Sequence, residues 1–211
     1  MTSDRGRKRI AFISCPEWSV MCPPYNLSLL SAIVKQNGFE SKIFDLNVEC
    51  YQFLLKREGI DYWEGQNYFY WLENNFSKMM LPKIEVLVKK IVGDVIRYNP
   101  DFVGISLYDT NVGCTKEVIK RIRQKNKKIR IVIGGPQCVV PEYIKTLGID
   151  YDLLFTGEAE TTIVDALNNP IDQKIYRATK PANLNELPPA DYSDFNFDNY
   201  ATYGVSAEAS R

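Results

Sequence analysis

Five short apolar segments, each followed by a polar or turn-forming stretch, set the strongest limit on how this chain can fold. They lie at residues 10–14, 42–45, 102–107, 129–133 and 152–155, and the second is apolar only at Ile43 and Phe44. Continuous apolar runs of this length are typical of strands that are buried on both faces of a parallel sheet. Segments with a helical spacing of apolar residues separate them. This alternation predicts a parallel sheet that is covered by helices on both faces.

The order of the strands follows from the rules that govern such sheets. Crossovers between parallel strands are right-handed, which leaves few topologies. We therefore predict an α/β fold with a doubly wound, five-stranded parallel sheet of the flavodoxin-like (Rossmann-like) order 2-1-3-4-5. The clearest helix begins after Pro82 and ends at Asn99-Pro100. A later helix is expected to begin at Thr115, and residues 46–81 are expected to be the least regular part.

The domain organisation is predicted from changes in composition. Residues 1–8 are expected to be a disordered tail, and residues 9–170 to form the sheet domain. Residues 171–211 are acidic and contain three prolines, so we expect a poorly packed linker outside the sheet. Its apolar side chains suggest a strip that docks on its own domain, on another domain or on a second copy of the chain, which makes self-association plausible. They are Leu184, Leu187, Tyr192, Phe195, Phe197, Tyr200 and Tyr203.

Charge and composition exclude several classes of function. Lysine plus arginine and aspartate plus glutamate both number 26, and a balanced charge argues against a nucleic-acid binder or a membrane-surface binder. The chain contains no histidine, which excludes Ser-His-Asp triads, zinc sites with histidine ligands and histidine general bases. The apolar run near the N-terminus is too short for a signal peptide or a membrane span, so a cytoplasmic location is expected.

The five cysteines are scattered and form no CxxC or CxxxCxxC motif. They therefore indicate neither a disulfide scaffold nor a complete metal or iron–sulfur site, and free thiols fit a reducing cytosol. Cys15 and Cys22 could serve as nucleophiles. Because no histidine is present to activate them, buried or incidental thiols are the better interpretation. We predict no catalytic residue and no metal ligand in this chain.

Glycine-rich and polar turns follow three of the predicted strands, at the edge where doubly wound sheets bind ligands. Ser106, Tyr108 and Asp109 follow the third strand, Gly134-Gly135-Pro136 the fourth, and Gly157-Glu158 the fifth. One such turn is more often a plain connection, but several at one edge favour a ligand site. The edge carries no GxxxxGK[ST] motif and no GxGxxG motif after the first strand, which argues against a dedicated phosphate site.

Several strings of the sequence together resemble a known family. They are the Pro23-Pro24 loop running into LSLLSAIVKQNGFES, then NPDFVGIS, IVIGGPQ, LLFTGEAETT and LNELPPADYSDFNFDNY. They resemble the cobalamin-binding domain of the cobalamin-dependent radical SAM enzymes, over about residues 9–200. In that family a radical SAM domain opened by a CxxxCxxC motif comes next. The resemblance thus implies that this chain is the N-terminal part of a longer enzyme and is inactive by itself.

The resemblance also implies a site and cofactors. It places a corrinoid at the carboxyl edge of the sheet, with the nucleotide tail beside the third and fourth strands. The DxHxxG signature of methionine-synthase-type domains is absent, so base-off cobalamin without a histidine ligand is expected. SAM and a [4Fe–4S] cluster would belong to the full-length enzyme, of the methyltransferase, cyclase or Fe–S oxidoreductase type. The implied cofactor-binding residues are Ser106, Leu107, Tyr108, Asp109, Gly134, Gly135, Pro136, Gly157 and Glu158.

Two other functions remain open at the level of sequence. The first is a stand-alone, flavodoxin-like binding module that binds no cobalamin. The second, ranked last, is the nucleotide-sugar-binding half of a glycosyltransferase, because no basic cradle for a diphosphate is visible. The aromatic stretch at residues 62–76 is expected to pack in the core, and a cap over the corrin ring or a contact with the radical SAM domain is the alternative.

Overall fold

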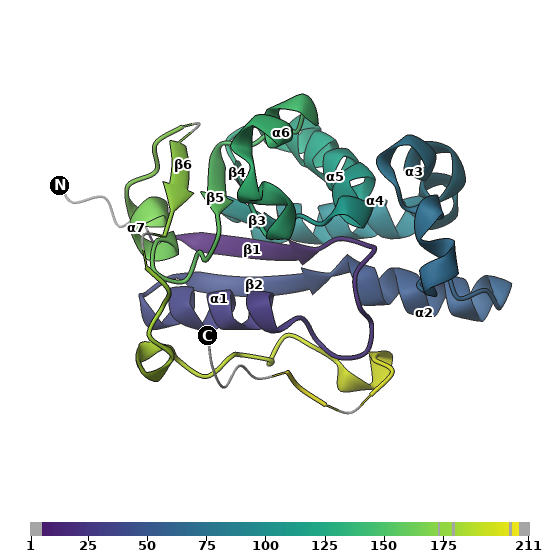
Figure 1. Ribbon diagram of the computed structural model, residues 1–211, viewed down its shortest axis with the longest axis horizontal. Helices are drawn as coiled ribbons and strands as arrows, with labels where there is room; N and C mark the ends of the chain where they lie inside the picture. Colours follow the sequence, from purple (N-terminus) through teal and green to yellow (C-terminus); the bar gives the residue numbers. More distant parts are fainter. Residues whose placement is uncertain (1–5, 173, 179, 203, 207–211) are drawn as a thin grey trace.

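The computed structural model describes residues 6–172, 174–178, 180–202 and 204–206. Within these residues, six parallel strands form one sheet with the order β2-β1-β3-β4-β5-β6 (Figure 1). The predicted parallel sheet of flavodoxin-like order is therefore confirmed, with one further strand at the end. The strands are β1 (Arg9–Ser14), β2 (Glu40–Asp45), β3 (Phe102–Ser106), β4 (Arg130–Gly134), β5 (Leu153–Thr156) and β6 (Lys174–Arg177).

Helices cover both faces of this sheet. The α-helices are α1 (Tyr25–Gln36), α2 (Leu46–Glu58), α3 (Glu73–Met79), α4 (Leu81–Tyr98), α5 (Val112–Lys125), α6 (Pro141–Thr146) and α7 (Ile163–Asn168). Short 3-10 turns are η1 (Gly65–Tyr70), η2 (Asp109–Asn111), η3 (Pro136–Val139), η4 (Leu184–Glu186) and η5 (Phe197–Asn199). The core on one face includes α1 and α7, and the core on the other includes α2 to α6. No described helix is long and apolar enough to cross a membrane.

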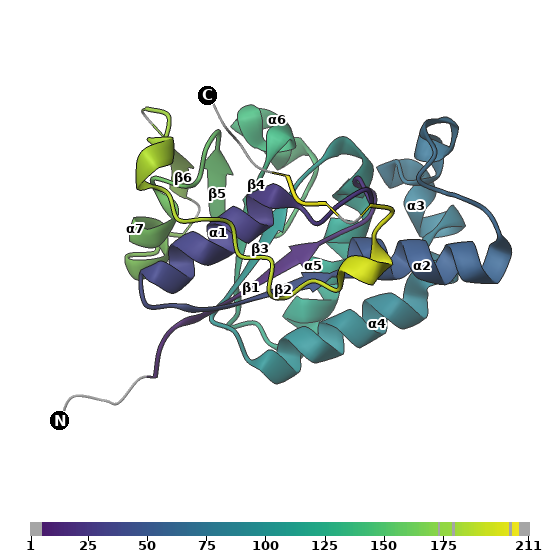
Figure 2. The ribbon, with the colours of Figure 1, turned by 90° about the horizontal axis from the view of Figure 1, so that it is seen from below.

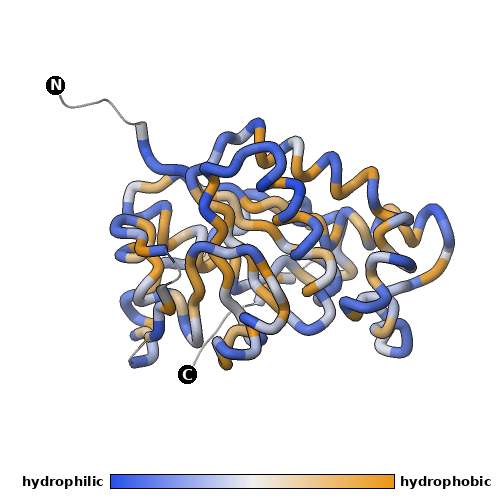
Figure 3. The backbone as a smooth tube through the Cα atoms, turned by 90° about the horizontal axis from the view of Figure 1, so that it is seen from above, coloured by the Kyte–Doolittle hydropathy of each residue, from blue (hydrophilic) through white to orange (hydrophobic). Residues whose placement is uncertain are grey.

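Alternation along the strands builds the two cores. In β1, Ile10 and Phe12 pack toward α1 and α7, whereas Ala11 and Ile13 pack toward the opposite layer. Successive side chains of a strand point to opposite faces, so a strand covered on both sides must be apolar at every position. Figure 3 shows the result, with hydrophobic segments gathered inside and hydrophilic ones outside.

The sixth strand corrects one prediction. Residues 174–177 were expected to belong to a linker outside the sheet, but β6 pairs in parallel with β5 from Leu153 to Thr156. The Tyr176 ring stacks on Phe155 with the centroids 5.1 Å apart. Four residues are too few to show a strand period in sequence. The strand exists because β5 offers it an unpaired edge.

Residues 180–202, the C-terminal strap, also differ from the prediction of poor packing. The strap runs back beside α1 and places η5 next to α2 (Figure 2). Asp191 pairs with Lys35 at 2.7 Å, and the Asp194 carboxylate accepts a 3.0 Å hydrogen bond from the Ile43 backbone N–H. The apolar strip therefore docks on its own domain. Tyr203 lies outside the described residues, as do residues 1–5 of the predicted N-terminal tail.

The stretch at residues 46–81 is more regular than expected. The Asp45 side chain caps α2 by accepting a 3.0 Å hydrogen bond from the Val48 N–H, and Gly59 ends the helix with a φ of 67°. Of the aromatic residues, Tyr62, Trp71 and Phe76 are buried in the core with α4 and α5, as expected.

Helix α5 begins at Val112, three residues before Thr115, where the sequence predicted its start. Thr115 is fully buried inside the helix. The turn η2 leads directly into this helix. The Asn111 side chain holds that turn by accepting a 2.9 Å hydrogen bond from the Tyr108 N–H.

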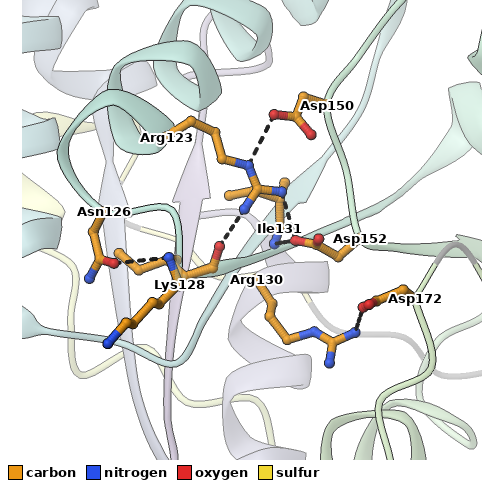
Figure 4. Close-up of polar contacts among 9 residues, drawn as sticks. Arg123, Asn126, Lys128, Arg130, Ile131, Asp150, Asp152 and Asp172 are labelled. Atoms are coloured by element: carbon orange, nitrogen blue, oxygen red, sulfur yellow. Dashed lines mark hydrogen bonds and ion pairs between the residues drawn. The ribbon is translucent and has the colours of Figure 1, made fainter.

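A polar cluster holds β4 to β5 at the amino end of the sheet (Figure 4). Arg123 donates hydrogen bonds to Asp152 at 2.7 Å, to Asp150 at 3.1 Å and to the Ile129 carbonyl at 2.6 Å. Asp152 in turn accepts from the Ile131 N–H at 2.6 Å. These bonds satisfy groups at the start of both strands, at the end of the sheet opposite the predicted ligand edge.

Candidate functional site

A pocket of about 390 Å³ opens at the carboxyl edge, between the sheet and helices α1 and α7. We call it the edge pocket. The turns that follow β3, β4 and β5 all border it, as expected for the ligand edge of a doubly wound sheet. Its lining consists of Phe12, Asn26, Leu27, Leu30, Gly104, Ile105, Ser106, Tyr108, Val132, Gly134, Gly135, Pro136, Val139, Phe155, Gly157, Glu158, Ala159, Glu160 and Ile163.

The floor of the edge pocket is apolar and depends on glycine. Phe12, Val132 and Phe155 belong to the core that faces α1. A Cβ atom at Gly104 would lie 2.7 Å from Cδ1 of Phe12, so the Phe12 ring can lie against the β3 backbone only because Gly104 has no side chain. Leu30 of α1 forms part of the opposite wall. The interior therefore offers mostly carbon to a ligand.

The turn after β4 is fitted tightly against the end of β3. Gly135 has a φ of 101°, and a Cβ atom there would lie 2.6 Å from Ser106 Oγ and 2.8 Å from the Leu107 nitrogen. The Leu107 N–H donates to the Gly134 carbonyl at 2.7 Å, and the Gln137 N–H donates to the Leu107 carbonyl at 3.2 Å. Glycine is thus required here by the backbone conformation and by contact within the protein itself.

Polar side chains gather at the mouth of the pocket. Asn26 Nδ2 at the start of α1 donates to Ser106 Oγ at 3.1 Å and to the Tyr108 hydroxyl at 3.5 Å. Burial raises the pKa of Tyr108 above its ordinary value, against the opposing effect of hydrogen bonds with Ser106 and Asn26. The phenol therefore stays protonated. The mouth offers neutral hydroxyl and amide groups for orienting a ligand.

Seven of the nine residues implied by the resemblance line the edge pocket, and two do not. Leu107 is fully buried in the core on the other face, and only its backbone takes part in the turn. Asp109 is exposed and accepts a 3.2 Å hydrogen bond from Gln137 Nε2. Among the seven, Glu158 has a structural bond as well, because its carboxylate accepts from the Ala182 N–H at 3.0 Å.

Several lining residues were missed at the sequence level. Asn26 and Leu30 lie in α1, and Phe12 and Gly104 lie inside strands. A helical stripe or an apolar run predicts that such residues are buried. It does not show which of them border a cavity, because that depends on how the helix crosses the sheet. Asn26 carried a usable signal, as a polar residue at the end of the loop that follows the first strand.

Two larger grooves lie elsewhere. One, of about 650 Å³, lies along α3 and α5, where Lys116 pairs with Glu73. The other, of about 600 Å³, lies between β2, α4 and the C-terminal strap. Neither collects the turns that follow β3, β4 and β5. We therefore assign the site to the edge pocket despite its smaller volume.

The thiols of Cys50, Cys114 and Cys138 do not form a reactive centre. Burial raises the pKa of Cys138 to about 12 and the pKa of Cys50 and Cys114 well above the ordinary range of a thiol. These groups stay protonated near neutral pH and are poor nucleophiles. Within the described residues, no group of three or more cysteine, aspartate or glutamate side chains is arranged to hold a metal ion.

The sequence of the segment that forms most of this edge matches a family. Residues 74–167 match the B12 binding domain. The match runs from α3 to α7 and includes the turns after β3, β4 and β5. It covers less than half of the chain and leaves β1 and β2 outside. It confirms the resemblance to cobalamin-binding domains, and B12 is another name for cobalamin.

Two kinds of enzyme are among the solved structures that are similar to this chain. Two are of the radical S-adenosylmethionine methyltransferase TsrM from Kitasatospora setae, with 17% identity, TM-scores of 0.46 and 0.49, and coverage of 79% of this chain but 27% of TsrM. The third is the glycosyltransferase SnogD from Streptomyces nogalater, with 15% identity, a TM-score of 0.43, and coverage of 84% of this chain and 51% of SnogD. One fold serves many activities, so these likenesses assign none. Among curated proteins, none matches the sequence.

Proposed function

We propose that this chain binds cobalamin at the carboxyl edge of its sheet, with the nucleotide tail of the cofactor in the edge pocket. The observation that carries the proposal is a coincidence of two features. The segment that matches the B12 binding domain contributes the three turns that border a well-formed, largely apolar pocket. Pockets for small ligands range from about 300 to 1,000 Å³, and this one lies within that range.

The residues of the pocket fit such a tail. An aromatic base needs apolar walls, which Phe12, Val132 and Phe155 provide on the sheet side. The attached sugar needs neutral hydrogen-bonding groups, and Ser106, Tyr108 and Asn26 hold hydroxyl and amide groups at the mouth. The pocket is far smaller than a whole corrinoid, so the corrin ring would stay outside, over the carboxyl edge.

The charge of the lining argues against the glycosyltransferase alternative. No lysine or arginine is among the described residues that line the pocket, and Glu158 and Glu160 stand at its rim. A nucleotide-sugar carries a diphosphate, which is normally held by cations or by backbone N–H groups at a helix N-terminus. The tail of cobalamin carries one phosphate instead of two, placed between its ribose and the corrin ring, so its base and ribose suit this lining better.

The absence of histidine determines how the chain would hold the cofactor. When the tail lies in the edge pocket, its base no longer coordinates cobalt, and this chain has no histidine imidazole to take the place of that base. We therefore expect the base-off form without a histidine ligand. When bound, cobalamin supplies cobalt chemistry that can carry a methyl group or accept electrons. The chain itself would bind the tail, orient the ring and exclude water from the apolar pocket.

We extend the proposal to a larger enzyme, in which a radical SAM domain holds SAM and a [4Fe–4S] cluster. The support is the resemblance of the strings from the Pro23-Pro24 loop to LPPADY, which come in the order of that family. A methyltransferase, a cyclase and an Fe–S oxidoreductase all fit. A CxxxCxxC motif encoded shortly after Arg211 would support this extension, and a gene that ends at Arg211 would contradict it. The alternative is then a stand-alone flavodoxin-like module.

Binding of hydroxocobalamin tests the proposal directly. The chain is mixed with hydroxocobalamin and desalted, and the visible spectrum and the Kd by equilibrium dialysis are measured. We expect one retained corrinoid per chain with a base-off spectrum. Leu30→Trp, which fills the pocket from α1, should weaken binding by about tenfold or more, a change of at least ~1.4 kcal/mol.

A matched control separates filling of the pocket from a general effect of tryptophan. Leu55 lies on the exposed side of α2, outside the pocket lining, so Leu55→Trp should leave the Kd unchanged. Loss of all corrinoid on desalting of the unmodified chain would overturn the proposal. Equal binding by a folded Leu30→Trp variant would overturn the placement of the tail.

A further inference from the structure

Two aromatic rings from distant parts of the chain are stacked beside the mouth of the edge pocket. Trp18 lies in the loop after β1, and Tyr108 lies directly after β3. Their ring centroids are 3.9 Å apart and the planes are inclined by 18°. Tyr108 lines the edge pocket, and a narrow cleft next to it is bordered by Trp18, Asn26, Ser106 and Tyr108. The stacked pair thus lies next to the wall of the edge pocket.

The loop that carries Trp18 is held in place by buried groups. Asn47, which is only 2% exposed, accepts a 3.1 Å hydrogen bond from the Trp18 N–H and donates a 3.0 Å hydrogen bond to the Trp18 carbonyl. On the other side, the Thr110 hydroxyl donates to the Glu17 carbonyl at 2.8 Å. The indole is therefore positioned before any ligand arrives, and binding to it costs little conformational entropy.

Trp18 nevertheless remains 41% exposed. Tyr108 covers one side of the indole, and the exposed part is a rigid apolar surface beside the pocket mouth. If the tail lies in the edge pocket, the part of the cofactor that does not fit must lie outside this mouth. That part is the corrin ring, a large and nearly flat macrocycle, which can bury apolar area against an indole.

We propose that the Trp18–Tyr108 pair is a platform for the corrin ring, with Trp18 in direct contact with it. The inference rests on the proposed cobalamin site and goes beyond it by assigning the residues that contact the corrin ring. The edge pocket binds the nucleotide tail, and the platform binds the ring. The platform contacts the ring without supplying a ligand to cobalt, which agrees with a chain that has no histidine.

Three probes separate the two surfaces. They are hydroxocobalamin, cobinamide, which has the ring but lacks the nucleotide, and α-ribazole, which is the nucleoside of the tail alone. Titration calorimetry gives the Kd of each probe. We expect Trp18→Ala to weaken hydroxocobalamin and cobinamide by about tenfold, the scale of a lost aromatic stacking contact, and to leave α-ribazole unchanged. Leu30→Trp should weaken the binding of hydroxocobalamin and α-ribazole and leave the binding of cobinamide unchanged.

Two more variants guard against trivial effects. Trp18→Phe keeps an aromatic face and should retain most of the affinity for cobinamide. Tyr68 is 52% exposed and lies outside the pocket lining, so Tyr68→Ala should change no Kd. Circular dichroism checks that each variant is folded.

The outcomes distinguish this inference from the proposed function. If hydroxocobalamin binds and Trp18→Ala has no effect on it or on cobinamide, the platform is wrong and the cobalamin site stands. If Trp18→Ala weakens all three probes equally, Trp18 is structural and the platform is also wrong. An unmodified chain that binds hydroxocobalamin but no cobinamide likewise contradicts the platform. If no probe binds, the proposed function itself fails.

Discussion

At Gly135 the backbone has a φ of 101°, in a region that residues with a Cβ atom rarely adopt. The same glycine lies against Ser106 Oγ and the Leu107 backbone, so an added methyl group would meet atoms that cannot move freely. From the sequence, the glycine pair after β4 predicts a place where a ligand approaches. The structure shows that Gly135 is needed by the protein's own turn, whether or not a ligand is bound.

A pair of glycine substitutions tests this difference. Gly135→Ala should lower the free energy of unfolding by about 1–3 kcal/mol, because the strained φ and the close contacts add to one another. Gly93, inside α4, has open space at its Cβ position, and Gly93→Ala should raise stability by up to ~1 kcal/mol. Urea denaturation measures both. Equal stability of Gly135→Ala and the unmodified chain would contradict the assigned role of this turn.

As an element, the C-terminal strap is held by specific polar bonds as well as by apolar packing. Besides the Asp191–Lys35 pair, the Gln52 side chain donates to the Asn199 carbonyl at 2.8 Å, and the Tyr200 hydroxyl donates to the buried Asp45 carboxylate. Burial is the main cause that raises the pKa of Asp45, and the bond from Tyr200 partly offsets it. The strap thus supplies a hydrogen bond to the Asp45 carboxylate at the end of β2, and this bond lowers the cost of burying that group.

Acidification should loosen the strap through Asp191. Burial opposes the charge of Asp191, but the hydrogen bonds from Lys35 and Ser193 outweigh it and lower the pKa of Asp191 to about 2. A carboxyl with a depressed folded pKa stabilises the protein above its unfolded pKa, about 3.9, and this stabilisation is lost as the pH falls toward 2. Asp191→Asn should therefore cost about 1 kcal/mol at pH 7.

The measurement is the free energy of unfolding of both forms against pH. The difference between Asp191→Asn and the unmodified chain should shrink as the pH falls from about 4 to about 2. Glu186 is an exposed acid on the same strap that accepts a hydrogen bond from nearby Asn183, so Glu186→Gln serves as the control with little effect. A difference that stays constant down to pH 2 would show that the Asp191 charge does not hold the strap.

At the scale of the whole molecule, the two outermost strands of the sheet, β2 and β6, are protected in different ways. At one edge, the strap lies over β2, and the Asp194 carboxylate satisfies the Ile43 N–H. At the other edge, β6 is a four-residue strand. An exposed strand edge can pair with another chain, and proteins prevent this by covering it or by keeping it short. Both means are present here.

Removal of residues 183–211 should therefore uncover the β2 edge. We expect the shortened chain to be less stable and to self-associate, which light scattering coupled to size-exclusion chromatography would detect. Binding of α-ribazole should persist, because the lining of the edge pocket lies before residue 183. A shortened chain that is monomeric and as stable as the full one would show that the strap has no protective role.

Much of the fold could be predicted because it depends on local pattern. The segments at 10–14, 102–107, 129–133 and 152–155 are mostly apolar and are buried on both faces, so their composition indicates strands in a covered parallel sheet. The apolar stripe of α4 repeats over several turns and likewise predicts a helix from local sequence alone. The turns at Gly134-Gly135 and Gly157 were found because a positive φ demands glycine, and that demand is visible in one residue. The absence of histidine needs no structure at all.

The remaining features depend on contacts between residues that are far apart in the sequence. Lys35 and Asp191 are 156 positions apart, and Asn26 and Ser106 are 80 apart. No local period records such a pair, because each partner only has to be polar and suitably placed. For the same reason the sequence predicted neither β6 nor the Trp18–Tyr108 stack. The amino-acid sequence by itself determined five of the strands and the places where the backbone must turn. The packing of α1 and α7 against the sheet decided which side chains border the pocket, because helix crossing and loop position arise only when the whole chain is folded.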